Sequence, residues 1–218
     1  MTEAEWLACT DPAPMLEFLR GKASDRKLRL FAVACCRRLW HLMAEESWRQ
    51  AVEMAERYAD KIGSKRALQR LWSEIEKAEI TRTQRIPTYR GEFLPSHAVE
   101  AVLRVDAFFA ARLISVVVPD VNDVQIRLVA ILADIVGNPF RPITINPAWL
   151  TPTVSNLATA AYEERALPSG ELDPARLAVL ADVLEEAGCQ EEEIPRHLRS
   201  SGPHVRGCWV VDLIVGKE

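Results

Sequence analysis

The sequence predicts an all-α protein, a single compact multi-helix domain of about ten helices. Apolar residues recur at intervals of three and four along most of the 218-residue chain, as in the run Leu28, Phe31, Cys35, Leu39 and Leu42. Capping side chains followed by proline stand at the starts of several such stretches, and glycine stands at their ends. The two-residue alternation typical of β-strands is rare.

The first half of the chain contains well-marked helix starts. Thr2 with Glu5 fits a capping box, Asp11 precedes a proline at the first helical position, and Ser24 is a further N-cap. The apolar residues 116–118 precede a proline and are interpreted as a helix end rather than a strand. We therefore expect helices over residues 2–8, 12–20, 25–43, 46–61, 65–80 and 96–117.

The second half repeats these signals, with Thr151 and Asp173 each followed by proline. Its last helix is expected to begin at Pro203 and to be apolar on every side except at Asp212, which makes it a buried central helix. Buried Asp212 then needs a partner, for which Arg206 or an arginine of the basic half is the candidate. The expected helices cover residues 121–136, 152–165, 174–187, 191–199 and 204–215.

Two long breaks interrupt the helices. Residues 82–95, RTQRIPTYRGEFLP, are basic and form either a loop or a joint between lobes 1–81 and 96–218 of a single helical domain, 1–218. Residues 137–150, GNPFRPITINPAWL, contain three prolines, which stiffen the chain. This second break is too apolar for a free linker, so we expect an ordered connector over the core.

The composition is that of a globular cytoplasmic protein. Apolar residues make up 49 % and charged residues 27 %. No apolar stretch reaches the roughly 18 residues of a membrane helix, and the acidic start lacks the order of a signal peptide. Five irregularly spaced cysteines argue against a disulfide framework. These features predict free thiols and no membrane association.

The charge is unevenly distributed about a net of −4. Residues 20–90 contain 17 Lys/Arg against 9 Asp/Glu, whereas residues 151–200 contain 4 against 10. One expected helix carries several basic residues together with Trp40, but they spread over much of its circumference, whereas phosphate binding needs them on one face. Nucleic-acid binding is therefore a weak alternative. The basic residues are Arg26, Lys27, Arg29, Arg37 and Arg38.

The densest group of metal-ligand residues is Cys189, His197, His204 and Cys208, which suit tetrahedral zinc. Their spacing, C-x7-H-x6-H-x3-C, matches no common zinc module. A helix over residues 204–215 would place His204 and Cys208 one turn apart on one face. The alternative is structural: buried cysteines, partly exposed histidines and no metal. A nucleophile pair of Cys208 and His204 is disfavoured, because a cysteine in an apolar helix lacks access to solvent.

Arg141 lies in the proline-rich connector and is a candidate anchor. It binds either a carboxylate or phosphate ligand, or an acidic residue of the core such as Asp212 or Asp134. Phosphate-loop, dinucleotide-binding, zinc-protease and nucleophile-elbow motifs are absent from the sequence.

Four blocks carry a resemblance that runs along the whole chain: MTEAEWLACTDPAPMLEFLRGKASDRKLRLFAVACCRRLWHLM, GNPFRPI, LADVLEEAGC and GPHVRGCWVVDLIVGKE. With these blocks the chain resembles an uncharacterised family of paralogous proteins expanded in planctomycete bacteria of the Gemmata type. The resemblance implies a domain that stands alone or beside other modules, and it implies no chemistry.

These observations favour a non-enzymatic helical scaffold or protein-interaction module with a protein partner. A second hypothesis is a small metal-binding protein or enzyme centred on Cys189, His197, His204 and Cys208. A third is a nucleic-acid-associated regulator that uses the basic half.

Overall fold

The computed structural model describes residues 1–83, 98–99, 102–103, 106–108, 110–112 and 122–217. Within these residues the chain is all-α, as the sequence predicts, and its extended pairing is limited to two isolated bridges, Ala166 to Glu171 and Glu171 to Val205. In this described part, no helix has the length and apolar character that a bilayer crossing requires. The chain divides into two compact units, Met1–Val129 and Ala130–Glu218.

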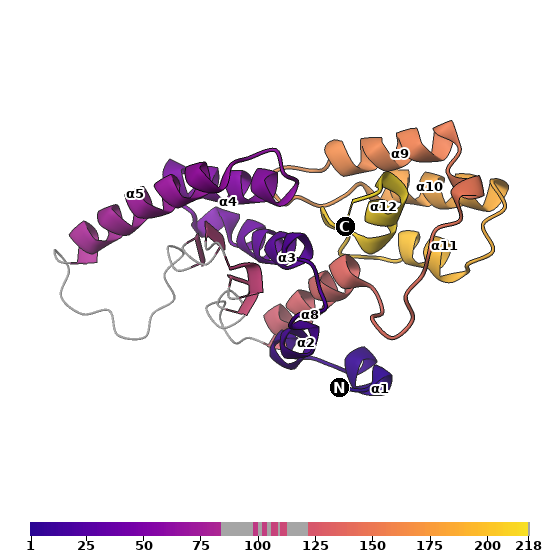
Figure 1. Cartoon of the computed structure of the whole chain (residues 1–218), viewed down its shortest axis with the longest axis horizontal. Coiled ribbons are helices and arrows are strands. Elements are labelled where there is room, and N and C mark those ends of the chain that lie inside the picture. Colours follow the sequence, from indigo (N-terminus) through magenta and orange to yellow (C-terminus); the bar gives the residue numbers. More distant parts are fainter. Residues whose placement is uncertain (84–97, 100–101, 104–105, 109, 113–121, 218) are drawn as a thin grey trace. The chain divides into compact units, whose positions relative to one another are not determined.

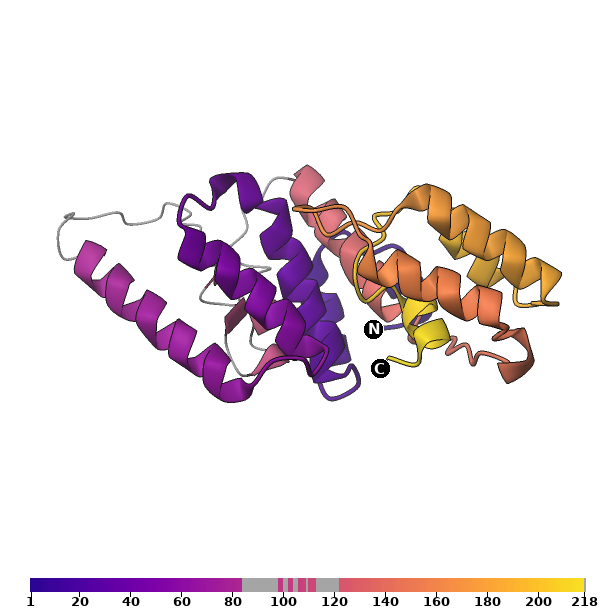
Figure 2. The ribbon, with the colours of Figure 1, turned by 90° about the horizontal axis from the view of Figure 1, so that it is seen from above.

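The N-terminal unit is built on helices that pack in chain order. Helix α3 packs on α4, and α4 packs on α5; Figure 2 shows α3 and α4 side by side. The Thr2 capping box and the Asp11 and Ser24 caps are present, which confirms these predicted starts. The elements of this unit are α1 (Glu3–Leu7), α2 (Pro12–Leu19), α3 (Asp25–Arg38), the 3-10 helix η1 (Trp40–Leu42), α4 (Glu46–Ala59), α5 (Lys65–Thr83) and the first part of α8 (Asn122–Val136) (Figure 1).

Three of the five basic side chains on α3 are buried. Arg26 forms an ion pair with Asp60 at 2.9 Å, and Arg37 forms one with Glu56 at 2.8 Å. Arg29 is buried as well, and its guanidinium donates to a backbone carbonyl at 3.2 Å. These three side chains turn inward and are not available to bind phosphate on the surface of α3, and the third hypothesis stays a prediction for the rest of the basic half.

The C-terminal unit has a core of its own, formed by helices α9 to α12. Helix α9 packs on α10 and α12, and α10 packs on α11. As predicted, the connector lies over this core, where Ile143, Ile145 and Trp149 are partly buried. The elements after α8 are the 3-10 helix η2 (Pro147–Trp149), α9 (Pro152–Glu163), α10 (Pro174–Glu186), α11 (Glu193–Leu198) and α12 (Trp209–Val215).

The last helix is shorter than the sequence predicts, because α12 begins at Trp209 and not near Pro203. In a helix the His204 carbonyl would accept from the Cys208 N–H. Here it accepts from the Leu172 N–H at 2.9 Å, and Cys208 instead donates to the Val205 carbonyl at 2.9 Å. Residues 204–208 are therefore an ordered turn. The burial prediction holds in part, since Val210, Val211, Asp212 and Ile214 are buried and the other α12 residues are partly exposed.

Other boundaries differ by a few residues. Helix α5 runs to Thr83 and so enters the predicted loop 82–95, whose remaining residues lie outside the described ones. Residues 116–118 also lie outside the described part. The division of the chain into two compact units falls between Val129 and Ala130, inside α8, and the predicted joint at residues 82–95 stays a prediction.

Candidate metal centre

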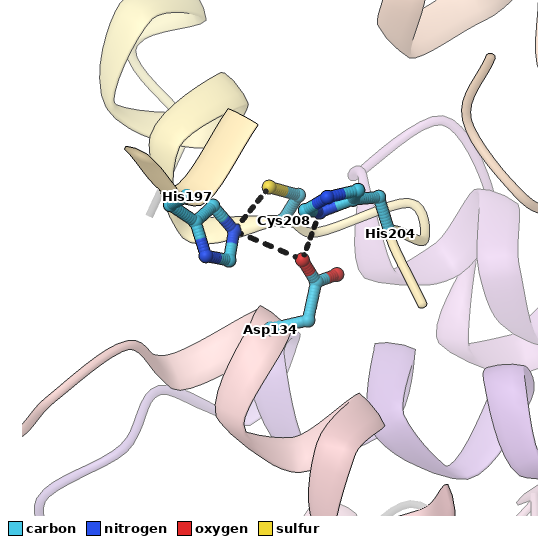
Figure 3. Close-up of side chains that lie close together, drawn as sticks. All are labelled: Asp134, His197, His204 and Cys208. Atoms are coloured by element: carbon cyan, nitrogen blue, oxygen red, sulfur yellow. Dashed lines mark hydrogen bonds and ion pairs between the residues drawn. The ribbon is translucent and has the colours of Figure 1, made fainter. Parts of the chain in front are cut away.

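Four polar side chains of the C-terminal unit point toward one another from three stretches of chain (Figure 3). Asp134 lies on α8, His197 on α11, and His204 and Cys208 on the turn before α12. Each offers one ligand atom, and the four atoms lie within 4.8 Å of one another. Asp134 Oδ1 is 2.9 Å from His204 Nδ1 and 3.1 Å from His197 Nε2. His197 Nε2 is also 3.2 Å from Cys208 Sγ.

A second layer of contacts orients three of these side chains. The other Asp134 oxygen, Oδ2, accepts the Val205 backbone N–H at 2.9 Å. His204 Nε2 lies 3.2 Å from both the carbonyl and the hydroxyl of Ser200. Backbone hydrogen bonds from the first turn of α12 favour the Cys208 thiolate. Such outer partners fix carboxylate and imidazole orientation at metal sites, and a ligating histidine usually donates its second N–H to a carbonyl.

Burial and charge shift the protonation of the group. Burial alone would raise the pKa of Asp134, but hydrogen bonds from His197 and His204 and the charges of those rings lower it below its usual range. Burial would lower the pKa of His204, but the hydrogen bond to Asp134, the Asp134 charge and the Ser200 carbonyl together outweigh burial, and the pKa is raised. Burial, with the Asp134 charge, raises the pKa of the Cys208 thiol well above its usual value. His197 is the most accessible member, with 20 % of its side chain exposed.

His197 Nε2 lies within bonding distance of two polar atoms at once. If Nε2 carries a proton, a single N–H faces both the Asp134 oxygen at 3.1 Å and the Cys208 sulfur at 3.2 Å. If the Cys208 thiol donates to Nε2 instead, the unprotonated nitrogen directs its lone pair at the Asp134 carboxylate. A cation among the four atoms would accept all of these lone pairs at once.

The structure brings together three of the four residues that the sequence grouped. His197, His204 and Cys208 converge, but Cys189 is not in the group, and its sulfur lies 4.0 Å from the Glu191 carbonyl. The predicted route to this convergence was wrong, because the turn at residues 204–208, and not a helical face, presents His204 and Cys208.

Asp134 takes the fourth place, and sequence reasoning considered it only as a partner of Arg141. The sequence does contain a signal for Asp134, which is an acidic residue within the apolar stripe that Ile131, Leu132 and Ile135 form on α8. A charged residue in a buried stripe needs a partner, and buried polar residues are more informative than exposed apolar ones.

The two predicted anchors lie elsewhere. Arg141 is exposed on the connector, and both Asp134 oxygens are engaged by the histidines and Val205. Asp212 is buried on α12, as predicted. Arg206 forms an ion pair with Glu163 at 3.7 Å, and its pairing with Asp212 stays a prediction.

Catalytic interpretations of the same residues meet physical obstacles. Cys208 is fully buried with a raised thiol pKa, so it is no ready nucleophile, and the ring nitrogen beside it belongs to His197 rather than His204. One contact sequence resembles a serine-hydrolase triad: the Ser200 hydroxyl lies next to His204 Nε2, and His204 Nδ1 lies next to the Asp134 carboxylate. The Ser200 carbonyl lies as close to His204 Nε2 as the Ser200 hydroxyl does, at 3.2 Å, and an Nε2–H that donates to this carbonyl cannot accept a hydroxyl proton.

Comparison with known proteins yields no relative: no family model, no curated protein and no solved structure matches this chain. The function is therefore inferred from the geometry of the four residues.

Proposed function

We propose that the protein binds one zinc ion in its C-terminal unit, through Asp134 Oδ1, His197 Nε2, His204 Nδ1 and Cys208 Sγ. The observation that carries the proposal is the position of His197 Nε2, at 3.1 Å from a carboxylate oxygen and 3.2 Å from a sulfur. Zinc binds imidazole nitrogen and carboxylate oxygen at about 2.0–2.2 Å and thiolate sulfur at about 2.3 Å, so a tetrahedral site separates its ligand atoms by about 3.3–3.6 Å. Three of the six separations in this group, 2.9, 3.1 and 3.2 Å, are within a few tenths of an ångström of that range, and all six are at most 4.8 Å.

The mixed donor set favours zinc over harder cations. Calcium and magnesium prefer sites made of oxygen ligands only, whereas a thiolate and two imidazoles suit a borderline-soft ion. Four protein ligands also leave no open position for substrate or water, which is the pattern of structural zinc sites. We therefore propose a non-enzymatic role, in which the ion supports the fold of this unit. The predicted protein-interaction role stays a prediction.

The direct test is metal analysis of the purified full-length chain after loading with zinc and removal of excess. We expect one zinc per chain in the wild type. Cobalt(II) substitution is expected to produce the intense visible bands of a tetrahedral site and a thiolate-to-cobalt charge-transfer band. The variant Cys208→Ser should lose that charge-transfer band and most of the bound metal.

Cys189→Ser is the matched control, because it removes a thiol from the same unit but outside the group. It should retain one zinc and the cobalt spectrum of the wild type. Absence of zinc from the loaded wild type would refute the proposal. Retention of zinc by Cys208→Ser, with its loss from Cys189→Ser, would refute the ligand assignment.

A further inference from the structure

The proposed zinc site connects parts of the C-terminal unit that close helix packing leaves apart. Among the described residues of this unit, the close helix pairs involve α9, α10, α11 and α12, and α8 is not a member of them. The apolar cluster around α9–α12 is made of residues 154–214, and the buried Ile131, Leu132 and Ile135 of α8 are not among its members. Asp134, on the last turns of α8, reaches this core through His197, His204 and the Val205 N–H.

The turn between α11 and α12 makes polar contacts with distant parts of the chain. Its backbone bonds join His204 to Leu172 and Val205 to Asp134, each at 2.9 Å. Residues 200–208 also lack the ladder of hydrogen bonds that stabilises a helix. Two of the four proposed ligands, His204 and Cys208, belong to this turn, so its position depends on the partners that those side chains find.

We infer that zinc docks the end of α8 and the turn 199–208 onto the core of α9–α12, so that these two segments are the metal-responsive part of the protein. This inference rests on the proposed function. With zinc bound, one ion replaces the crowded contacts of Asp134, His197 and Cys208. Without zinc, only the hydrogen bonds among Asp134, His197, His204 and the Val205 N–H hold these two segments to each other at this point.

The remaining helices have reasons to persist without the metal. Helices α9 and α10 have their own side-chain caps from Thr151 and Asp173. They also share an apolar interface that includes Ala158, Leu177 and Leu180. Metal loss is therefore expected to open two segments locally rather than to unfold the unit, because proteins commonly open one cooperative segment at a time.

Hydrogen–deuterium exchange of the full-length chain tests the inference. Chelator-treated protein is compared with the same protein in zinc chloride buffered to a free zinc concentration about 100 times the dissociation constant. A ligand at that excess suppresses openings that require its release by about 100-fold. We expect exchange about 100-fold slower in peptides covering residues 130–136 and 199–208, with little change in residues 177–186 of α10.

The variant Asp134→Asn should exchange at the metal-free rate in both segments whether or not zinc is added, whereas Cys189→Ser should respond as the wild type does. If Asp134→Asn does not fold, the wild-type comparison decides alone. One bound zinc without slower exchange in residues 199–208 would overturn the inference and leave the proposed function standing. Equal slowing in α10 would also overturn it, because zinc would then stabilise the whole unit. Failure to bind zinc would overturn both.

Discussion

Removal of the Glu56 carboxylate is expected to destabilise the N-terminal unit severely. Glu56 on α4 accepts two hydrogen bonds from the Arg37 guanidinium of α3, at 2.8 and 3.3 Å. The two side chains are 3 % and 2 % exposed. The substitution Glu56→Ala leaves the Arg37 charge in the interior without this carboxylate. Breaking a buried ion pair by removing one partner costs about 3–5 kcal/mol, because the remaining charge is uncompensated.

An exposed pair of the same length supplies the matched control. Arg20 and Glu17 are also 2.8 Å apart, but their side chains are 63 % and 49 % exposed. Solvent screening reduces such pairs to about 0.2–1 kcal/mol, so Glu17→Ala should cost less than a third of the Glu56→Ala effect. The double variant Arg37→Met with Glu56→Leu should recover most of the lost stability, since apolar replacements of similar volume remove both buried charges.

Urea denaturation followed by circular dichroism measures these differences, and hydrogen exchange in α3 and α4 locates them. A loss for Glu56→Ala no larger than that for Glu17→Ala would refute the reasoning. The outcome also bears on function. If Arg37 is structural, Glu56→Ala should leave nucleic-acid affinity unchanged at low salt, whereas a phosphate-binding Arg37 freed from its carboxylate would raise it.

Three further predictions concern the C-terminal unit. Zinc affinity, measured by competition with a chelator, should fall as the pH is lowered, by about tenfold per pH unit for each proton that zinc displaces. The reason is that the Cys208 thiol and the His204 ring both have raised pKa values and must be deprotonated before they bind zinc. Tyr162→Ala should cost about 3–5 kcal/mol in a denaturation experiment, and Tyr162→Phe, which keeps the buried ring, much less. Gly137→Ala should lower the melting temperature more than Gly188→Ala. Both glycines have a positive φ, 75° and 87°, so both substitutions strain the backbone. At Gly137 the new methyl would also lie 3.1 Å from an indole carbon of Trp209 on α12.

Local signals predicted most of the helices correctly because they act over a few residues. Asp11, Thr151 and Asp173 each accept the hydrogen bond expected of an N-cap before proline. Gly216 adopts the left-handed conformation at the end of α12, with φ of 67°. The prediction of an apolar connector over the core also followed from composition alone.

The same local signals were wrong at the start of the last helix. Pro203 is an acceptable first helical residue, and residues 203–208 contain no local signal for a turn in place of the helix. The partners that replace the helical bonds lie far away in sequence, since Leu172 takes the His204 carbonyl and Asp134 takes the Val205 N–H. A window of a few residues contains neither partner.

The sequence by itself determined the all-α class, most of the helix starts and the presence of His197, His204 and Cys208 in one short stretch, because caps, periodicity and composition are properties of neighbouring residues. Only the tertiary structure decided that Asp134, 63 residues before His197, completes the group in place of Cys189. The physical reason is that a ligand set is defined by distances in space, which depend on how α8, α11 and the turn before α12 fold together.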